Sequence, residues 1–417
     1  MAGQRAGVRS WLRWIVAELS ILMVADVSPL EPHGGAARVL REHSRGLRSR
    51  GHHVEVLCRM PSVESPAASD MDGVPVSQYN VNRAHPVAFF VSSILGARRA
   101  YARSLFGCEW DAVVFHQPLS ALGLRRILPR GTPMIYVFHS PAAVEYGIRA
   151  SHPDSSHPRL GVGVVCAVLG WAERATLRRC RRVVVLSDFS RRTLLGIHGP
   201  LSASVVRIPG GVDLRRFSPA PDRAVVRRAL GLPGDGLLLF SVRDLEPRMG
   251  LDALLRAVAL VRRDLPVRLI VGGRGRLQRQ LEDLARSLGL TDIVRFAGLI
   301  PEADLPRYYG AADCFVLPTR ELEGFGLVTV EALACGTPVL GTPVGATPEI
   351  LSPLAPELLT EDASPEALAS GIRRVVPLLG DAGFRVRCRA HAERHYGWAT
   401  VVARLEELLL ELVAERP

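Results

Sequence analysis

The chain has 417 residues, 48% of them hydrophobic and 22% charged, which excludes an intrinsically disordered protein and favours two α/β domains over a single core. All 52 basic residues are arginine, and the surplus of positive charge lies in the first half, where residues 1–217 hold 28 arginines against 15 acidic residues. No nucleic-acid-binding motif accompanies this charge, so nucleic acid is excluded as a partner, and two explanations stay open: a solvated arginine surface, or a peripheral contact with an anionic membrane or acidic acceptor.

Residues 1–18 form a leader in which Arg5, Arg9 and Arg13 recur at helical spacing. It is interpreted either as a short amphipathic membrane contact or as a tail outside the fold. Glu18 interrupts its apolar run, so no signal peptide is predicted. The longest apolar stretch, residues 160–172, is shorter than the roughly 20 residues that cross a bilayer, and it is predicted to be the buried face of a helix.

The cysteines favour a reducing compartment. There are seven of them, without a CxxC pair or other metal-ligand spacing, which is typical of free thiols. The protein is therefore expected in the cytoplasm, or at the inner face of the membrane if its arginines contact lipid.

Short apolar runs alternate with helical patterns from residue 21 onward. The first domain is predicted at 19–210, with a helix at 36–50 and Gly51 as its end. Its strands are expected at 21–25, 53–58, 112–116, 134–138 and 183–186. Strands interleaved with helices predict a parallel sheet that is covered on both faces.

A second series of the same kind follows a Pro- and Gly-rich linker at 208–221, which indicates a second domain at 211–394. Its strands are expected at 237–242, 268–272, 293–296, 314–317 and 338–341. A C-terminal helical segment, 395–417, is predicted to pack back on the first domain. Two doubly wound, Rossmann-like halves result, and in such sheets ligands bind at the carboxyl ends of the strands.

The segment from Glu323 to Ala334 carries the most specific pattern. It follows the strand at 314–317, starts as a glycine-containing turn and continues with helical spacing. Amide groups at such a helix start suit a diphosphate, and two carboxylates eight residues apart, Glu323 and Glu331, can reach sugar hydroxyls. The alternative is an ordinary turn followed by a helix with two surface acids.

This stretch resembles the E-x7-E signature of glycosyltransferase family 4 (group 1), whose members have the GT-B fold and retain anomeric configuration. Other segments resemble family motifs in the same order, over residues 20–410. They are the Gly34-Gly35 loop, Val137-Phe138-His139-Ser140, the 184–187 strand, the Ile208–Asp213 linker and the Gly272–Gly275 turn. The resemblance implies two Rossmann-like domains facing a central cleft and no cofactor beyond a nucleotide diphosphate sugar as donor.

The resemblance also implies a role for each matched residue. Glu331 would accept hydrogen bonds from the donor ribose, and Glu323 and His139 would contact the transferred sugar as catalytic residues. Backbone amides of the turn, and the open backbone of the glycine loop, would face the diphosphate. These donor-binding positions are Phe325, Gly326, Leu327, Gly34 and Gly35.

One motif departs from the family. Where the family places an arginine and a lysine on the donor phosphates, this chain has Asp244 and Met249. An acid there would repel a diphosphate. Arg243 or Arg248 could replace the lost cations by a shift of one residue, and we expect Arg248 to do so because it lies in the loop.

The implied reaction moves a sugar from a UDP- or GDP-linked donor to a hydroxyl acceptor on a glycolipid, glycan or small natural product. No metal-binding DxD motif follows a suitable strand, so helix dipole and arginine are expected to replace a cation. Two alternatives stay open. A sugar-nucleotide epimerase would share fold and nucleotide, and the departure at Asp244 and Met249 would also suit a non-catalytic relative acting as a binding partner.

Overall fold

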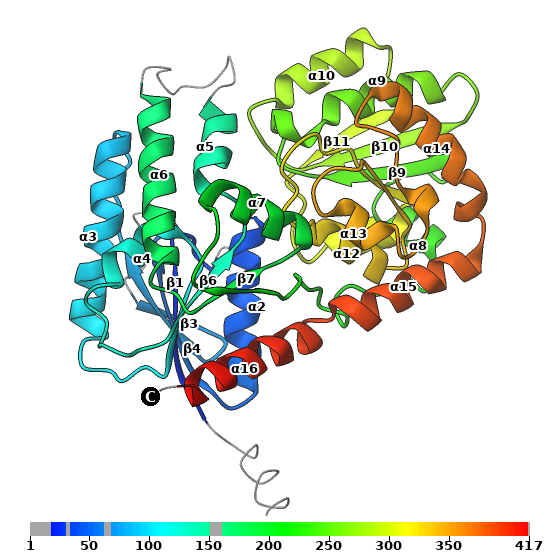
Figure 1. Ribbon diagram of the computed structural model, residues 1–417. Coiled ribbons are helices and arrows are strands. Elements are labelled where there is room, and N and C mark those ends of the chain that lie inside the picture. The colour runs from blue at the N-terminus through cyan, green and yellow to red at the C-terminus, as the bar shows by residue number, and fades with distance from the viewer. Residues whose placement is uncertain (1–17, 31–33, 62–67, 151–160, 416–417) are drawn as a thin grey trace, which may run out of the picture. The chain divides into compact units, whose positions relative to one another are not determined.

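The computed structural model describes residues 18–30, 34–61, 68–150 and 161–415, so the 1–18 leader lies almost wholly outside it. The chain forms two compact units (Figure 1). Unit 1 comprises Met1–Leu186, Arg191–Ile208 and Val401–Pro417, and unit 2 comprises Ser187–Ser190 and Pro209–Thr400. The change of unit between Ile208 and Pro209 falls in the predicted Pro- and Gly-rich segment.

Unit 1 is built on an eight-stranded sheet in the order β3-β4-β2-β1-β5-β6-β7-β8. Its strands are β1 (Ser20–Ala25), β2 (His53–Arg59), β3 (Ala68–Met71), β4 (Val74–Tyr79), β5 (Ala112–Phe115), β6 (Met134–Phe138), β7 (Arg182–Val185) and β8 (Ser204–Arg207). The central strands are runs of Val, Ile, Leu and Phe with no exposed surface, because helices cover both faces of a parallel sheet.

The β3–β4 hairpin and β8 were not predicted from the sequence. β3 pairs with β4 in antiparallel fashion, whereas every other neighbouring pair in this sheet is parallel. The hairpin turns at Asp72 and Gly73, whose φ angles of 54° and 83° suit the twist of a two-residue turn. All three strands lie at the sheet's margins and carry polar residues, so the apolar pattern that marks a buried strand is weak there.

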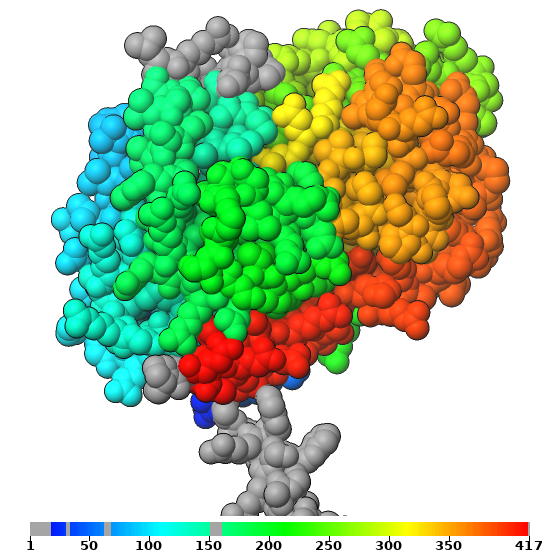
Figure 2. Space-filling view, viewed as in Figure 1, coloured from blue at the N-terminus to red at the C-terminus, as the bar shows by residue number. Residues whose placement is uncertain are grey.

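Helices α2 (Gly35–Ser49), α3 (Pro86–Ser104), α4 (Pro118–Leu124), α5 (Ala142–Ala150), α6 (Val162–Leu177) and α7 (Asp188–His198) connect these strands. The C-terminal helix α16 (Trp398–Ala414) belongs to unit 1 from Val401 onward, and it is visible at the surface in Figure 2. Its Glu406 accepts hydrogen bonds from Arg50 Nε at 2.7 Å and pairs with His52 Nε2 at 2.8 Å. Gly46 of α2 leaves room for Val402, which would lie 2.5 Å from an added Cβ.

The apolar segment predicted as a buried helix face is helical, but it is only partly buried, so the prediction of burial is wrong. It forms most of α6, in which Leu169 and Ala172 pack inward. Val164 and Trp171, however, expose 68% and 59% of their surface. The helix has apolar residues on nearly all sides, and the sheet can cover only one of them.

Unit 2 contains a five-stranded sheet, parallel throughout, in the order β11-β10-β9-β12-β13. Its strands are β9 (Leu237–Val242), β10 (Val267–Gly272), β11 (Val294–Gly298), β12 (Cys314–Leu317) and β13 (Val339–Gly341), close to the predicted ranges. Its helices are α8 (Arg223–Ala229), η2 (Pro247–Met249), α9 (Leu251–Val261), α10 (Gln278–Ser287), α11 (Leu305–Ala311), α12 (Leu327–Ala334), α13 (Thr347–Leu351), η3 (Pro356–Leu358), α14 (Pro365–Leu379) and α15 (Ala382–Tyr396).

A buried hydrogen-bonded cluster fastens α6 to the core of unit 1. Glu173, which is 1% exposed, accepts a hydrogen bond from Tyr136 Oη at 3.1 Å, and its other oxygen lies 2.8 Å from His198 Nε2. One carboxylate therefore joins β6, α6 and α7. Without it, two buried polar groups would lose their partner.

We expect Glu173→Ala to lower the free energy of unfolding by about 2–4 kcal/mol, because both partners stay buried and unsatisfied. Glu173→Gln keeps an acceptor and should cost less. Urea unfolding at neutral pH measures the effect, and Glu407→Ala on the exposed side of α16 is the control, expected to change stability by less than about 0.5 kcal/mol. Equal stability of the two alanine variants would contradict a structural role for Glu173.

Candidate functional site

The loops that follow β9, β10 and β12 meet at the carboxyl edge of the unit 2 sheet. They can approach closely because glycine stands at the points of contact. A Cβ on Gly273 would lie 1.8 Å from Arg243 O, and one on Gly275 would lie 2.5 Å from Leu245 O. The Leu245 amide donates to Arg274 O at 2.9 Å, so the first two loops are also hydrogen-bonded.

Two more glycines bring the β12 loop into the same place. Gly250 has a φ of 69°, and an added Cβ would lie 1.9 Å from Pro318 O. Gly345, with a φ of 65°, would place a Cβ 2.2 Å from Glu323 O. Any other residue would push the loops apart, so these glycines are required for the position of Glu323.

A buried ion pair joins the β9 and β12 loops. Arg243 Nη2 lies 2.6 Å from Glu323 Oε2, and the two side chains are 7% and 10% exposed. The same Nη2 lies 2.9 Å from Met249 Sδ, while Thr319 Oγ1 donates to Glu323 Oε2 at 3.2 Å. The carboxylate predicted to contact the sugar is thus held by a guanidinium and a hydroxyl.

The structure distinguishes the two arginines that the sequence offered as replacements for the lost cations. Arg243 points its guanidinium to Glu323 and to Met249, the residue at the family's lysine position. Arg248 instead donates from Nη1 to Leu322 O at 3.2 Å. Asp244 is exposed. The geometry therefore favours Arg243 over Arg248 as the cation beside Glu323.

Helix α12 begins directly after the turn that carries Glu323. Gly326 is its N-cap, with a φ of 87°, and Leu327 is its first residue. Phe325 is 5% exposed and packs its ring edge-on to Tyr396, with 5.7 Å between centroids, so what it offers to a ligand is its backbone. The first amides of a helix have no partner within it and carry the positive end of its dipole.

Glu331 lies one turn into α12 and is 2% exposed. Tyr309 Oη donates to Glu331 Oε2 at 3.0 Å, which fixes the orientation of the carboxylate. Two buried polar atoms close by in the fold, Arg243 Nε and Thr329 Oγ1, have no hydrogen-bond partner in the described part of the chain. Buried groups of this kind are normally paired, so a ligand or water is expected to satisfy them.

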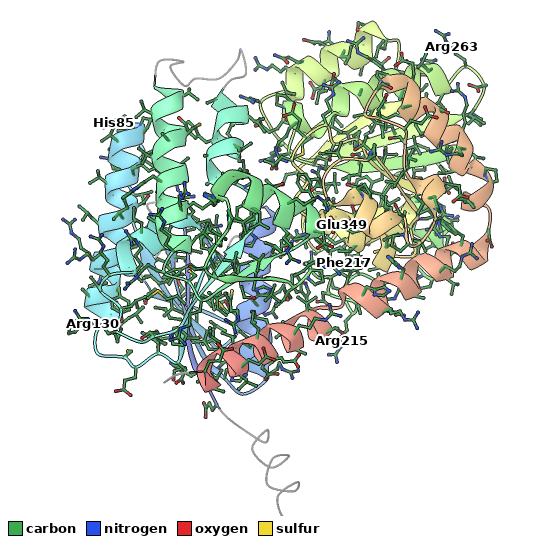
Figure 3. The ribbon with its side chains drawn as sticks, in the orientation of Figure 1. His85, Arg130, Arg215, Phe217, Arg263 and Glu349 are labelled. Carbon is green, nitrogen blue, oxygen red and sulfur yellow. The ribbon has the colours of Figure 1, made fainter. Side chains whose placement is uncertain are left out.

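Glu349 is a residue that the sequence analysis missed. It stands in the first turn of α13, in unit 2 (Figure 3), and accepts hydrogen bonds from the amides of Asp188 and Phe189 at 2.8 and 2.6 Å. Ser187 and Ser190 donate to Gly324 O at 2.7 and 3.0 Å. The 187–190 segment is therefore fixed to the turn beside Glu323, which a resemblance to motifs does not reveal.

In unit 1, His139 follows β6 and lies in a group of three histidines. His116, after β5, places Nδ1 3.0 Å from His139 Nε2, and the His43 and His116 ring centroids are 5.9 Å apart. Burial lowers the pKa of His43 to about 3 and that of His139 to about 4, and it lowers the pKa of His116 as well. All three rings are thus neutral at pH 7, and one of His116 and His139 donates the hydrogen bond between them while the other accepts it.

The predicted glycine loop is described only in part. Gly34 is the N-cap of α2, with a φ of 86°, and Gly35 is the first residue of that helix. Nothing lies within 4 Å of a Cβ added to Gly34, so its conformation, not crowding, requires glycine here. Residues 31–33 lie outside the described residues.

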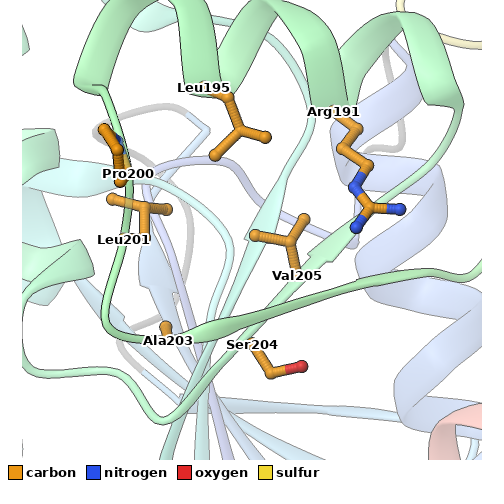
Figure 4. Close-up of a pocket in the computed structure, with 7 residues that line it drawn as sticks. All are labelled: Arg191, Leu195, Pro200, Leu201, Ala203, Ser204 and Val205. Carbon is orange, nitrogen blue, oxygen red and sulfur yellow. The ribbon is translucent and has the colours of Figure 1, made fainter.

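A shallow hollow in unit 1 lies between α7 and β8 (Figure 4). Leu195 and Val205 turn toward each other across it, and Arg191 stands at its edge. With a single charged group it offers no reacting pair. In the described residues no cluster of His, Cys, Asp or Glu has metal-binding geometry, and no helix is long and apolar enough to cross a bilayer. Each of the seven cysteines is a free thiol.

Comparisons with known proteins agree on one family. A model described as Glycosyltransferase Family 4 matches residues 33–216, and one described as Glycosyl transferases group 1 matches residues 222–394. The chain is 32% identical to a D-inositol 3-phosphate glycosyltransferase of Kineococcus radiotolerans, over 89% of either protein. It is 33% identical to the protein of that name in Actinosynnema mirum, over 80% of this chain and 82% of the relative.

Solved structures show the same fold. Sucrose-phosphate synthase from Thermosynechococcus elongatus matches with a TM-score of 0.79 at 22% identity, covering 95% of this chain and 99% of that one. WaaG, a glycosyltransferase involved in lipopolysaccharide biosynthesis, matches with a TM-score of 0.71 at 19% identity, covering 93% and 99%. The predicted GT-B fold with two Rossmann-like domains is confirmed.

The neutral histidines make the stability of unit 1 sensitive to acid. Below its ordinary pKa of about 6.5, a histidine binds a proton in the unfolded chain, whereas His43 stays neutral in the fold until pH is near 3. The unfolded state therefore gains protons first, and stability falls as pH drops from 7 to 4. We expect His43→Leu to reduce this fall by on the order of 3 kcal/mol in urea unfolding at both pH values. His395→Leu, at an exposed position, should leave it unchanged.

Proposed function

Because the chain belongs to the group 1 glycosyltransferases of glycosyltransferase family 4, we propose that it is a retaining, metal-independent hexosyltransferase that uses a UDP- or GDP-linked sugar. The observation that carries this proposal is the buried Arg243–Glu323 pair, 2.6 Å between Nη2 and Oε2, beside the start of α12. The pair supplies a cation and an oriented carboxylate at a place where Asp244 and Met249 replace the two cations of the family motif, and a helix N-terminus lies next to it. These are the groups that a leaving diphosphate and a transferred sugar require.

The donor diphosphate is proposed to lie against the amides of Phe325, Gly326 and Leu327, with Arg243 as its cation. Glu331, held by Tyr309, would accept hydrogen bonds from the ribose hydroxyls through its remaining acceptor capacity. Gly34 and Gly35 at the start of α2 are proposed to face the diphosphate or the acceptor, and nothing lies within 4 Å of a Cβ added to Gly34. Arg248 would support the loop instead of binding phosphate, because its Nη1 donates a hydrogen bond to the Leu322 carbonyl.

Substitution at the anomeric carbon would retain configuration without a covalent sugar–enzyme intermediate. The acceptor hydroxyl attacks from the face that the leaving phosphate departs from. Its proton passes to a phosphate oxygen, and the bond from the anomeric carbon to the donor oxygen breaks. The chain contributes position and charge: Glu323 orients the sugar, and Arg243 and the α12 amides stabilise the negative charge that develops on the diphosphate.

His139 is proposed to contact the transferred sugar as a hydrogen-bonding partner. Its lowered pKa, about 4 through burial, keeps the ring neutral, so it can accept or donate one hydrogen bond but adds no charge. His116, 3.0 Å away, is in a position to select the tautomer of His139. The two rings would then present a fixed donor and acceptor pattern to the substrate.

The acceptor is proposed to be a hydroxyl compound, and D-inositol 3-phosphate, which appears in the name of the relatives, is the first to test. A screen would combine this acceptor with UDP- and GDP-linked sugars and follow release of UDP or GDP. The arginine surplus of the first half also leads us to propose a peripheral contact with an anionic membrane at the inner face, in the cytoplasm.

The first prediction for the donor site concerns Arg243. Arg243→Ala should weaken binding of UDP or GDP by about ten- to a hundredfold, because the only guanidinium paired with Glu323 in the described site is lost. Calorimetry with the nucleotide alone measures this. Asp244→Ala, at the exposed neighbour, is the matched control and should change affinity by less than about threefold.

The opposite result would locate the phosphates elsewhere. If Asp244 faced the donor, Asp244→Arg would bind the nucleotide more tightly, and Arg243→Ala would bind it as the unchanged protein does. If Arg248 supplied the cation, Arg248→Ala would be the damaging change. One nucleotide titrated against all four variants separates these arrangements.

The second prediction separates the two carboxylates by what each would touch. Glu323→Gln should lower turnover far more than nucleotide affinity, because its partner is the reacting sugar, whereas Glu331→Ala should weaken nucleotide binding by about 1–3 kcal/mol. Initial rates and calorimetry on the same samples measure both. EDTA should leave turnover intact, and a strict need for Mg²⁺ or Mn²⁺ would contradict the metal-independent mechanism.

A further inference from the structure

Two helices of unit 1 that both pack against α4 leave apolar side chains in solvent. On α3, Val87 and Val91 are 66% and 50% exposed, and on α6, Val164 and Trp171 are 68% and 59% exposed. Leu95 and Val168 continue the two rows at 39% and 38%. Spacings of three and four residues place each row along one side of its helix.

The two rows lie on the same layer of unit 1. Phe90 of α3, Leu119 of α4 and Leu169 of α6 share one buried cluster, so the three helices pack side by side over the sheet. Figure 1 shows α3 and α6 running in the same direction, and Figure 2 shows both at the surface of unit 1. Helix α4 contacts both of them, and we call the exposed rows of α3 and α6 together the α3–α6 surface.

Each row continues into arginine toward the C-terminal end of its helix. The exposed arginines are Arg98, Arg99 and Arg103 on and after the middle of α3, and Arg174, Arg178 and Arg179 at the end of α6. Within the described residues no carboxylate pairs with any of these six side chains. The single acid of α6, Glu173, is buried with Tyr136 and His198, and α3 contains no acid.

We infer that the α3–α6 surface docks on an anionic lipid bilayer, with its apolar rows at the acyl boundary and its arginines on lipid phosphates. The assignment rests on the membrane contact proposed above and adds the surface that makes it. Valine and leucine suit the acyl boundary, Trp171 suits the headgroup level, and arginine binds phosphate oxygens bidentately.

Charge favours lipid over a second copy of the chain. A two-fold contact through this surface would bury the six arginines against a partner surface that offers no exposed carboxylate from α3 or α6. An anionic bilayer supplies the missing negative charge over the whole area. The apolar rows alone would not discriminate between the two.

The test compares binding of the full chain to vesicles of phosphatidylcholine, with and without phosphatidylglycerol, by flotation at low salt. The unchanged protein should bind the anionic vesicles and release them as salt increases. Arg174→Glu with Arg178→Glu should weaken binding about tenfold or more, and Val164→Ser with Trp171→Ser should do the same. The matched control, Arg263→Glu with Arg279→Glu, reverses two exposed arginines of unit 2 and should bind as the unchanged protein does.

Each contrary result would contradict a different part of this proposal. If the anionic vesicles bind every variant equally, or the control weakens as much, the α3–α6 surface is wrong although a membrane contact exists. If the unchanged protein binds no vesicles, the membrane contact itself fails. If it is instead a dimer that Val164→Ser with Trp171→Ser converts to monomer, a second copy covers the surface. UDP titration of the same variants should be unchanged, which keeps the donor-site proposal separate.

Discussion

The ion pair between Arg243 and Glu323 is the interaction around which the carboxyl edge of unit 2 is organised. Two side chains that are 7% and 10% exposed have little water around their charged ends, so each is stabilised by the other as a partner. Their carrying loops come from β9 and β12, which are neighbours in the sheet. The loops meet closely enough because Gly250, Gly273 and Gly345 lie where any Cβ would strike a carbonyl oxygen. The glycines thus allow the backbone positions that bring the Arg243 and Glu323 side chains together.

The same edge receives support from outside these loops. Glu349 accepts the amides of Asp188 and Phe189, and the hydroxyls of Ser187 and Ser190 donate to Gly324 O. These four part-buried hydrogen bonds tie the start of α7 to the turn before α12 and to α13. A turn held in this way keeps its amides in place, so in the proposed donor site little reorganisation is needed when negative charge develops there.

Much of this could be predicted from the sequence, for reasons that differ from element to element. The central strands and the α12 turn were predictable because apolar runs and glycine turns are local signals. The choice of Arg243 over Arg248 as the partner of Glu323 was not, because it depends on which way a side chain leaves a loop. The exposure of Val164 and Trp171 was missed as well. An apolar run shows that a segment has side chains that could be buried, but whether other elements cover them depends on the tertiary structure. Clusters such as His43, His116 and His139 join distant segments and leave no local pattern.

The proposed donor site differs from the family motif in the number of its cations. The family motif has an arginine and a lysine for the phosphates, whereas the proposed site has one guanidinium, that of Arg243, which also pairs with Glu323 and contacts the Met249 sulfur. The positive charge left for a diphosphate is therefore smaller. In the proposed donor site the α12 amides then carry a larger share of phosphate binding than in a member with both cations. Amides are fixed dipoles, and unlike Arg243 they are not engaged by a carboxylate. We therefore expect the loss of the two family cations to weaken binding of the donor in its ground state more than it weakens stabilisation of the leaving diphosphate in the transition state.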